Sequence, residues 1–142
     1  MKKIILAVMM LIGTSTAFAG DSEPLKAILK AQNYAEAANL VQSTLDQLAG
    51  NEEKAKAYNR LYELAMKKVN YEEGIQLENE TQKQMGKEGN KPVDEKGLYA
   101  AVGAAFNSGV EAIKYDNMPN QKGKVKPKYA ALVESVYKLR ND

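Results

Sequence analysis

The sequence predicts an all-helical fold, with about six helices after an N-terminal export signal. No stretch of the 142-residue chain keeps the alternation of apolar and polar residues that a half-buried strand requires. Apolar residues instead recur every three or four positions, which is the period of one face of an α-helix. The chain has no Cys, so helix packing alone must stabilise it. We therefore expect antiparallel helices that pack in pairs around a modest core.

The first 19 residues contain the three parts of a secretory signal. Lys2 and Lys3 supply the positive start, Ile4–Ile12 is an unbroken apolar run, and Ala17-Phe18-Ala19 is a small-x-small cleavage pattern. The run is shorter than the roughly 20 apolar residues that span a bilayer, which disfavours an uncleaved membrane anchor. We expect an exported, periplasmic protein with no transmembrane segment after cleavage. Because no Cys follows the cleavage site, a thioether-linked lipoprotein is not expected.

The composition of the mature chain excludes several functions. Cleavage after Ala19 leaves 123 residues, enough for one domain, and removal of Lys2 and Lys3 leaves 18 basic and 18 acidic side chains. A neutral chain lacks the positive charge on which generic nucleic-acid binding depends. The absence of His and Cys removes the usual ligands of zinc, haem and iron–sulfur clusters and the usual nucleophile–base pairs. We expect no metal, no cofactor and no enzymatic activity.

Four helices are expected in the first half of the mature chain. Ser22 is a candidate N-cap for a short first helix, and one apolar stripe marks a second helix over 34–48. Gly50 is expected to end that helix, and Asn51 to cap a third one. A fourth helix should begin at Tyr71, but its apolar stripe is thin. We therefore expect the fourth helix to be peripheral or mobile.

The second half divides into a linker, a long helix, a loop and a last helix. Gly and Pro residues mark the linker over 87–94, and Asp94 is a candidate cap for the long helix over 95–115. A loop rich in Asn, Pro, Gly and Lys covers 116–127. Apolar residues at helical spacing over 129–137 predict the last helix.

The most informative pattern is an internal repeat. Asn33-Tyr34-Ala35-Glu36-Ala37-Ala38 returns 37 residues later as Asn70-Tyr71-Glu72-Glu73-Gly74-Ile75. We expect each copy to lie at a tight turn between two helices. The Asn would tolerate the backbone conformation of the turn, and the Tyr would wedge between the helices. Each pair would then bury its apolar face by stacking on the next. The alternative is a helical bundle with a chance Asn-Tyr echo.

This pattern resembles the tetratricopeptide repeat, a helix–turn–helix unit of about 34 residues. In the second unit Tyr58 fills the large aromatic position of the family, Leu61 its leucine position and Gly74 its small position. The match has departures, since Tyr62 stands where the family usually has Gly and Ala65 where it has Tyr. Neither unit has the usual closing Pro.

The resemblance covers roughly residues 24–86 and, more loosely, the remainder. It implies a short right-handed solenoid in which residues 20–86 form two helix pairs and residues 95–142 form a divergent third pair. The chain also resembles the N-terminal portion of longer exported tetratricopeptide proteins of Gram-negative bacteria, in which a basic loop like Lys122–Lys128 precedes further repeats. The family implies an interaction scaffold for a protein or peptide partner. A structural bundle that associates with itself is the alternative.

In this family the first helix of each pair lines a concave, partner-binding surface. The correspondence places five side chains there: Lys56, Asn59, Glu63, Met66 and Lys67. A Met among mixed polar groups suits recognition of a peptide. The carboxylate clamp of the family has a basic residue at the position of Asn59 and Asn at that of Glu63, so capture of a C-terminal carboxylate is not implied. An ordinary solvated helix face is the alternative.

Four lysines alternate along the predicted loop: Lys122, Lys124, Lys126 and Lys128. In an extended conformation they would project to one side and contact an anion or a lipid headgroup at a membrane surface. Four charges alone bind weakly at physiological salt, so a solvated loop is the alternative.

Acidic pairs occur at Glu72/Glu73 and Glu78/Glu80. Paired carboxylates perform acid–base chemistry when burial separates their pKa values. We expect polar, exposed surroundings for both pairs, and therefore assign neither a catalytic role.

Overall fold

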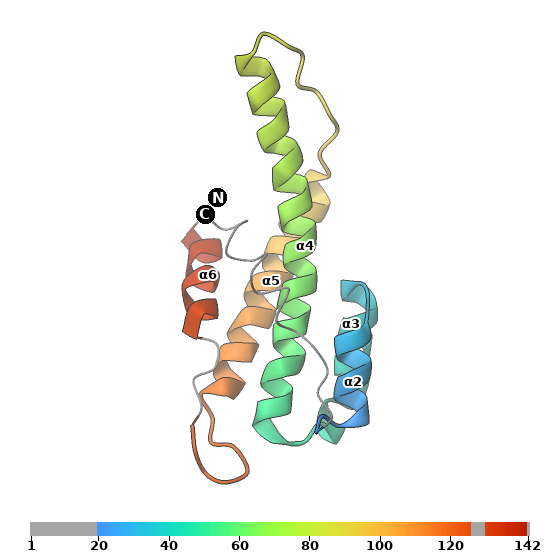
Figure 1. Ribbon diagram of the computed structural model, residues 1–142, viewed down its shortest axis with the longest axis vertical. Coiled ribbons are helices and arrows are strands. Elements are labelled where there is room, and N and C mark those ends of the chain that lie inside the picture. The colour runs from blue at the N-terminus through green and yellow to red at the C-terminus, as the bar shows by residue number, and fades with distance from the viewer. Residues whose placement is uncertain (1–19, 126–129, 142) are drawn as a thin grey trace.

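The computed structural model describes residues 20–125 and 130–141, so the export signal lies outside the described residues (Figure 1). The described residues form five α-helices and one 3₁₀ turn, with no strand. In chain order they are α2 (Glu23–Lys30), α3 (Tyr34–Thr44), η1 (Leu45–Gln47), α4 (Gly50–Gln84), α5 (Glu95–Asp116) and α6 (Ala130–Asn141). The prediction of an all-helical fold is confirmed for this part of the chain.

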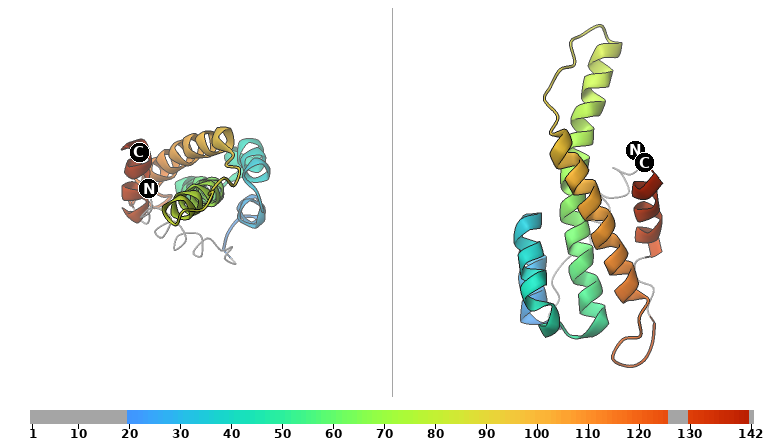
Figure 2. Two further views of the ribbon diagram at one scale, coloured as in Figure 1. Left: turned by 90° about the horizontal axis from the view of Figure 1, so that it is seen from above. Right: turned by 180° about the vertical axis from the view of Figure 1, so that it is seen from behind.

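A long antiparallel hairpin of α4 and α5 forms the axis of the molecule (Figure 1). The views of Figure 2 show α2 and α3 together against one side of this hairpin and α6 against the other. The helices α2 and α3 pack on α4, whereas α6 packs mainly on α5.

Two apolar cores follow from this arrangement, and α4 contributes to both. The first core lies between α4 and the two short N-terminal helices, and its larger members are Leu25, Ile28, Leu29, Val41, Leu48, Leu61 and Leu64. The second core lies between α4, α5 and α6, and its largest members are Tyr62, Met66, Val69, Leu98, Leu132, Val136 and Leu139. Tyr34 and Tyr58 pack against both cores and so connect them.

The predicted turn at the second copy of the repeat is wrong. α4 is one helix of 35 residues that runs unbroken through Asn70 and Tyr71. The third and fourth helices of the sequence prediction are therefore one element, and the described residues hold five α-helices instead of about six. Tyr71 is 66% exposed and does not wedge between helices. A second helix pair within residues 20–86 is absent for the same reason.

The helix continues because no local signal stops it and a distant segment holds it. Residues 67–73 contain neither Gly nor Pro, and Gly74 carries an ordinary helical backbone with open space beside it. Lys68 lies 3.5 Å from the Glu72 carboxylate one turn on and 3.0 Å from Asp94 in the connection to α5. The Asp94 amide also donates to Glu72 (3.3 Å). These contacts fasten the helical conformation across the second motif copy.

The expected caps are confirmed at α2 and α5, and Asn33, which was expected at a turn, also caps α3. The Ser22 hydroxyl accepts from the Leu25 amide, Asn33 Oδ1 accepts from the Glu36 amide (2.8 Å), and Asp94 Oδ1 accepts from the Gly97 amide (2.9 Å). Each cap satisfies one amide that has no partner within its helix.

The expected cap at Asn51 is wrong. Gly50 adopts φ of +76°, a conformation that favours glycine, and begins α4 instead of ending α3, which stops at Thr44 before the 3₁₀ turn. The amide of Ala49 donates to the Glu53 carboxylate (2.9 Å), which reaches back over the first turn as in a capping box. Asn51 instead donates to the Pro119 carbonyl (2.8 Å) in the loop after α5.

The last turns of α4 extend beyond the other helices, and the connection over 85–94 returns alongside them (Figure 1). Asn79 fastens the return, because its amide group donates to the Lys91 carbonyl (2.9 Å) and accepts from the Lys91 amide (3.0 Å). A Cβ at Gly89 would lie 2.2 Å from the Asn79 carbonyl oxygen, so only glycine fits there. The sequence expectation of a peripheral segment agrees with its exposed side chains.

Close backbone approach lets α6 pack on α5. A Cβ at Gly109 would meet Val136 at 2.4 Å and the Tyr62 ring at 3.3 Å. Leu132 and Val136 are buried at this contact (0% and 4% exposed). No helix within the described residues combines the length and hydropathy needed to cross a membrane.

Candidate partner-binding surfaces

The five side chains expected on a partner-binding surface lie along α4, but their exposure differs. Lys67 is exposed, and Lys56 is partly exposed and pairs with Asp21 (3.1 Å). Asn59, Glu63 and Met66 are 5%, 0% and 0% exposed. In this structure, a partner on this face of α4 therefore meets lysine side chains first.

A polar network accounts for the buried part of this face. The Asn59 amide group donates to Glu63 (3.3 Å), and the Arg60 guanidinium lies 3.5 Å from the same carboxylate. Arg60 also donates to the Ala31 carbonyl at the end of α2 (2.9 Å). A buried charge is stable only when it is paired in this way. The network thus fixes α2 to α4, while Met66 belongs to the second core.

The basic loop is turned, not extended, where it is described. Asn120 Oδ1 accepts from the amides of Lys122 (2.9 Å) and Lys124 (3.1 Å), and the Asn120 carbonyl accepts from Gly123 (2.9 Å). Lys122 and Lys124 are both exposed. Lys126 and Lys128 lie outside the described residues. The single-sided row that an extended loop would present is therefore not formed at its first two lysines.

The expected exposure of the first acidic pair is wrong. Glu72 and Glu73 are 3% and 5% exposed, and the connection to α5 covers Glu72, whose carboxylate accepts from the Asp94 amide. As successive residues of a helix they point about 100° apart. Glu72 faces Lys68 and Asp94, whereas Glu73 faces a groove described next. They do not converge on one site, and Glu78 pairs with Lys91 (2.7 Å) at the surface.

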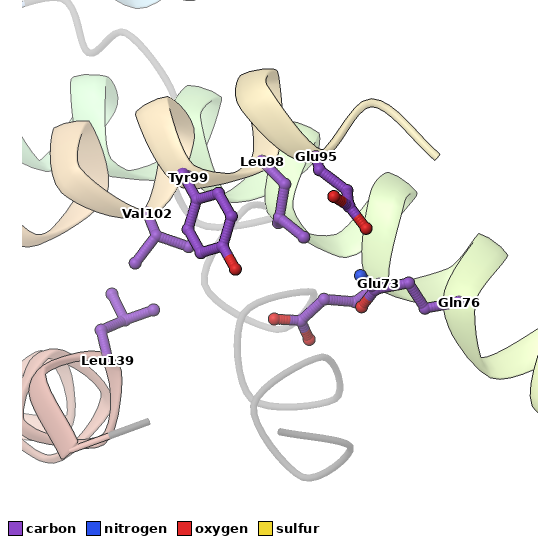
Figure 3. Close-up of a pocket in the computed structure, with 7 residues that line it drawn as sticks. All are labelled: Glu73, Gln76, Glu95, Leu98, Tyr99, Val102 and Leu139. Carbon is purple, nitrogen blue, oxygen red and sulfur yellow. The ribbon is translucent and has the colours of Figure 1, made fainter. Parts of the chain in front are cut away.

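Side chains from three helices converge on a groove of about 290 Å³, shown in Figure 3. We call it the acid-rimmed groove. Its apolar wall comes from α5 and α6, and two carboxylates lie at its α4 side and at the start of α5. The lining residues are Glu73, Gln76, Glu95, Leu98, Tyr99, Val102 and Leu139. Tyr99 is 76% exposed, and no basic side chain is among these lining residues.

A second groove, of about 210 Å³, runs between α5 and α6, and the described residues that line it are all apolar or aromatic. We call it the apolar groove. Its lining residues are Phe106, Val110, Ile113, Val133, Val136 and Tyr137. Val110 and Tyr137 remain 40% and 58% exposed. Exposed apolar side chains beside a groove make it a candidate interaction surface.

The groups described next have shifted pKa values and lie outside both grooves. The hydrogen bond from the Gly97 amide and the Lys68 ammonium hold the pKa of Asp94 below its ordinary value, and the same contact with Asp94 raises the pKa of Lys68. Burial raises the pKa of Tyr62 to about 12. These groups are structural, since none of them lines either groove.

The sequence reasoning missed both grooves. Its available signal was the wide apolar face of the long helix, where Leu98, Val102 and Phe106 cover more of the surface than one neighbour can bury. Among residues 20–125 and 130–141, no cluster of three or more acidic, His or Cys side chains could hold a metal ion. Comparisons with protein-family models, curated proteins and solved structures each find no match.

Proposed function

We propose that the protein is an exported, non-enzymatic module that binds a protein or peptide in the bacterial cell envelope. The acid-rimmed groove carries this proposal. Ligand sites are typically concave and apolar with a few convergent polar groups, and this groove has that composition. At about 290 Å³ it has room for one or two side chains, which suits an anchor residue of a peptide better than a large cofactor.

The chemistry of the rim specifies the occupant. Leu98, Val102 and Leu139 offer apolar contact, and the exposed Tyr99 ring can cover an inserted side chain. Glu95 at the groove edge adds negative charge. The best-matched ligand is a peptide segment with a large apolar residue next to Lys or Arg, because its cation complements the acidic rim.

The export signal supports a location in the periplasm, and we keep a tetratricopeptide-like relationship as part of the proposal. That relationship is confined to α2, α3 and the first half of α4, where Asn33 caps the second helix of the pair. A self-associating bundle without a ligand groove is the second candidate, which the apolar groove favours. Contact with a membrane surface through Lys122 and Lys124 is a weaker candidate, because only these exposed charges of the loop support it.

Peptide display with the processed chain, which begins at Gly20, tests the proposal. Selected peptides should combine an aromatic or large aliphatic residue with an adjacent Lys or Arg. Tyr99→Ala should weaken the selected peptide by about tenfold, a typical loss for an interface aromatic. Glu95→Gln should reduce affinity less and should flatten its dependence on salt.

Two matched variants keep this test specific. Tyr71→Ala removes another exposed tyrosine, outside both grooves, and should leave peptide affinity unchanged. Lys67→Ala probes the α4 face that the repeat correspondence favours. If Lys67→Ala abolishes binding while Tyr99→Ala does not, the partner docks on α4 and the groove assignment is wrong. Failure to select any peptide would remove the proposed function.

A further inference from the structure

The outer face of α6 has a pattern that matches a second copy of itself. Val133 and Tyr137 lie one turn apart and line the apolar groove, and Glu134 and Lys138 lie one turn apart beside them. The two charged side chains pair with each other at 3.4 Å in the monomer, with 78% and 44% exposed. Opposite charges thus flank an apolar stripe at the same spacing.

We propose that the chain forms a two-fold symmetric dimer in which the α6 helices of two copies cross antiparallel over the apolar groove. A two-fold interface requires that whenever residue i contacts residue j, residue j contacts residue i in return. In an antiparallel pair centred between positions 135 and 136, Val133 lies within one residue of the position opposite Tyr137 of the other copy. The same axis brings Glu134 within one residue of the position opposite Lys138.

Self-complementarity is the reason to prefer a second copy to an unrelated partner. Antiparallel helices place the same flank of each helix together, so Glu134 and Lys138 form two identical cross-pairs without any further residue. Breaking the exposed pair within each copy costs little free energy, since surface ion pairs contribute only about 0–1 kcal/mol. The apolar side chains, including the 40% exposed Val110, supply the driving force.

The expected dimer is weak. α6 has 12 residues and is therefore about 18 Å long. A contact of this length buries less than the roughly 800 Å² per partner of a stable complex. We expect a dissociation constant of about 10–100 µM, so that dimer and monomer exchange with concentration.

Sedimentation velocity of the processed chain over a concentration series tests the dimer. Glu134→Lys alone and Lys138→Glu alone each place four like charges across the two-fold axis, and each variant should dimerise about fivefold more weakly or worse. An equimolar mixture of the two variants restores both cross-pairs between unlike copies. The mixture should therefore dimerise at least as well as the unsubstituted chain.

The mixture separates an intermolecular role from a structural one, because a variant that merely misfolds is not rescued by the other. Tyr137→Ala should weaken dimerisation about tenfold, whereas Tyr99→Ala, which removes the exposed tyrosine of the acid-rimmed groove, should not change it. A chain that remains monomeric up to about 500 µM would overturn the dimer. A mixture no stronger than either variant would overturn the antiparallel α6 pairing.

The dimer does not rest on the peptide-binding proposal. Loss of peptide binding in Tyr99→Ala with an unchanged dimer, and the reverse in Tyr137→Ala, would show that the grooves act separately.

Discussion

The two copies of the Asn-Tyr motif share three of six residues but have different structural roles. At Asn33-Tyr34 the chain turns, Asn33 adopts an extended backbone with φ of −138° and caps α3, and Tyr34 packs against both cores. At Asn70-Tyr71 the chain stays helical, and the Tyr71 ring points into solvent. The same two side chains thus begin one helix and lie within another.

The difference lies outside the motif. Before the first copy, Ala31 leaves the helical region at ψ of 137°, and its carbonyl is held by Arg60 from α4. Around the second copy, Lys68, Glu72 and Asp94 hold the helix together. A capping residue permits a turn, but a tertiary contact decides whether the chain takes it.

Proline substitutions should give the largest difference in stability between the two motif copies. Tyr71→Pro removes a helical hydrogen bond in the interior of α4 and should destabilise the processed chain by about 3 kcal/mol or more. Ala35→Pro lies in the first turn of α3, at the position that Pro24 already occupies in α2, and should cost about 1 kcal/mol or less. Urea unfolding monitored by circular dichroism measures both. Equal costs would mean that α4 bends or breaks at Tyr71 in solution.

Replacement of each tyrosine by alanine should show how much its ring contributes to the packing of the cores. Tyr34→Ala removes a partly buried ring that touches both cores and should cost about 2–3 kcal/mol. Tyr71→Ala removes an exposed ring and should change stability by less than about 0.5 kcal/mol. Thermal melts compare them directly. A large cost at Tyr71 would restore the wedge that the repeat predicts.

The two asparagines should respond with opposite signs. Asn33→Ala removes the N-cap of α3 and should cost about 1 kcal/mol. Asn70→Ala should stabilise the chain by a few tenths of a kcal/mol, because Ala has the higher helix propensity and Asn70 Oδ1 is buried with no hydrogen-bond partner among the described residues. Equilibrium unfolding at neutral pH measures both values. Destabilisation at both positions would contradict the assignment of Asn70 to a helix interior.

Acid should loosen the contact that spans the second copy. The pKa of Asp94 is lowered in the folded state, so its charge stabilises the fold above the ordinary carboxyl pKa and this stabilisation is lost as pH falls below about 4. Asp94→Asn keeps a capping side chain without the charge. Its unfolding free energy should therefore depend less on pH between about 4 and 2, with only a small difference at neutral pH. Matching pH profiles for the two chains would show that Asp94 is not involved.

Much of this fold follows from local signals. Ser22 and Asp94 mark helix starts because a cap depends on three or four neighbouring residues, which a sequence displays directly. The continuity of α4 was not predictable in this way, since Asp94 lies more than 20 residues from the motif that it holds. The periodic pattern also gave no sign that Glu72 is buried.

The candidate sites were harder to foresee than the helices. The α4 face came from a family correspondence, and the structure buries Asn59, Glu63 and Met66 of that face. Both grooves form where side chains of different helices converge, and such convergence depends on crossing geometry that no single helix encodes. The exposed Tyr99 and Tyr137 became informative only once their neighbours were known.

Because α4 forms a wall of both cores, neither core can close without it. We therefore expect α4 to belong to the folding nucleus, with the two N-terminal helices and α6 adding to it in either order. Hydrogen exchange should find the slowest amides of the chain between Ala57 and Val69, where both cores meet the same backbone. Beyond Glu73, where α4 leaves the other helices, protection should fall by several orders of magnitude within a few turns. A single element would then span the whole range from global unfolding to local fraying.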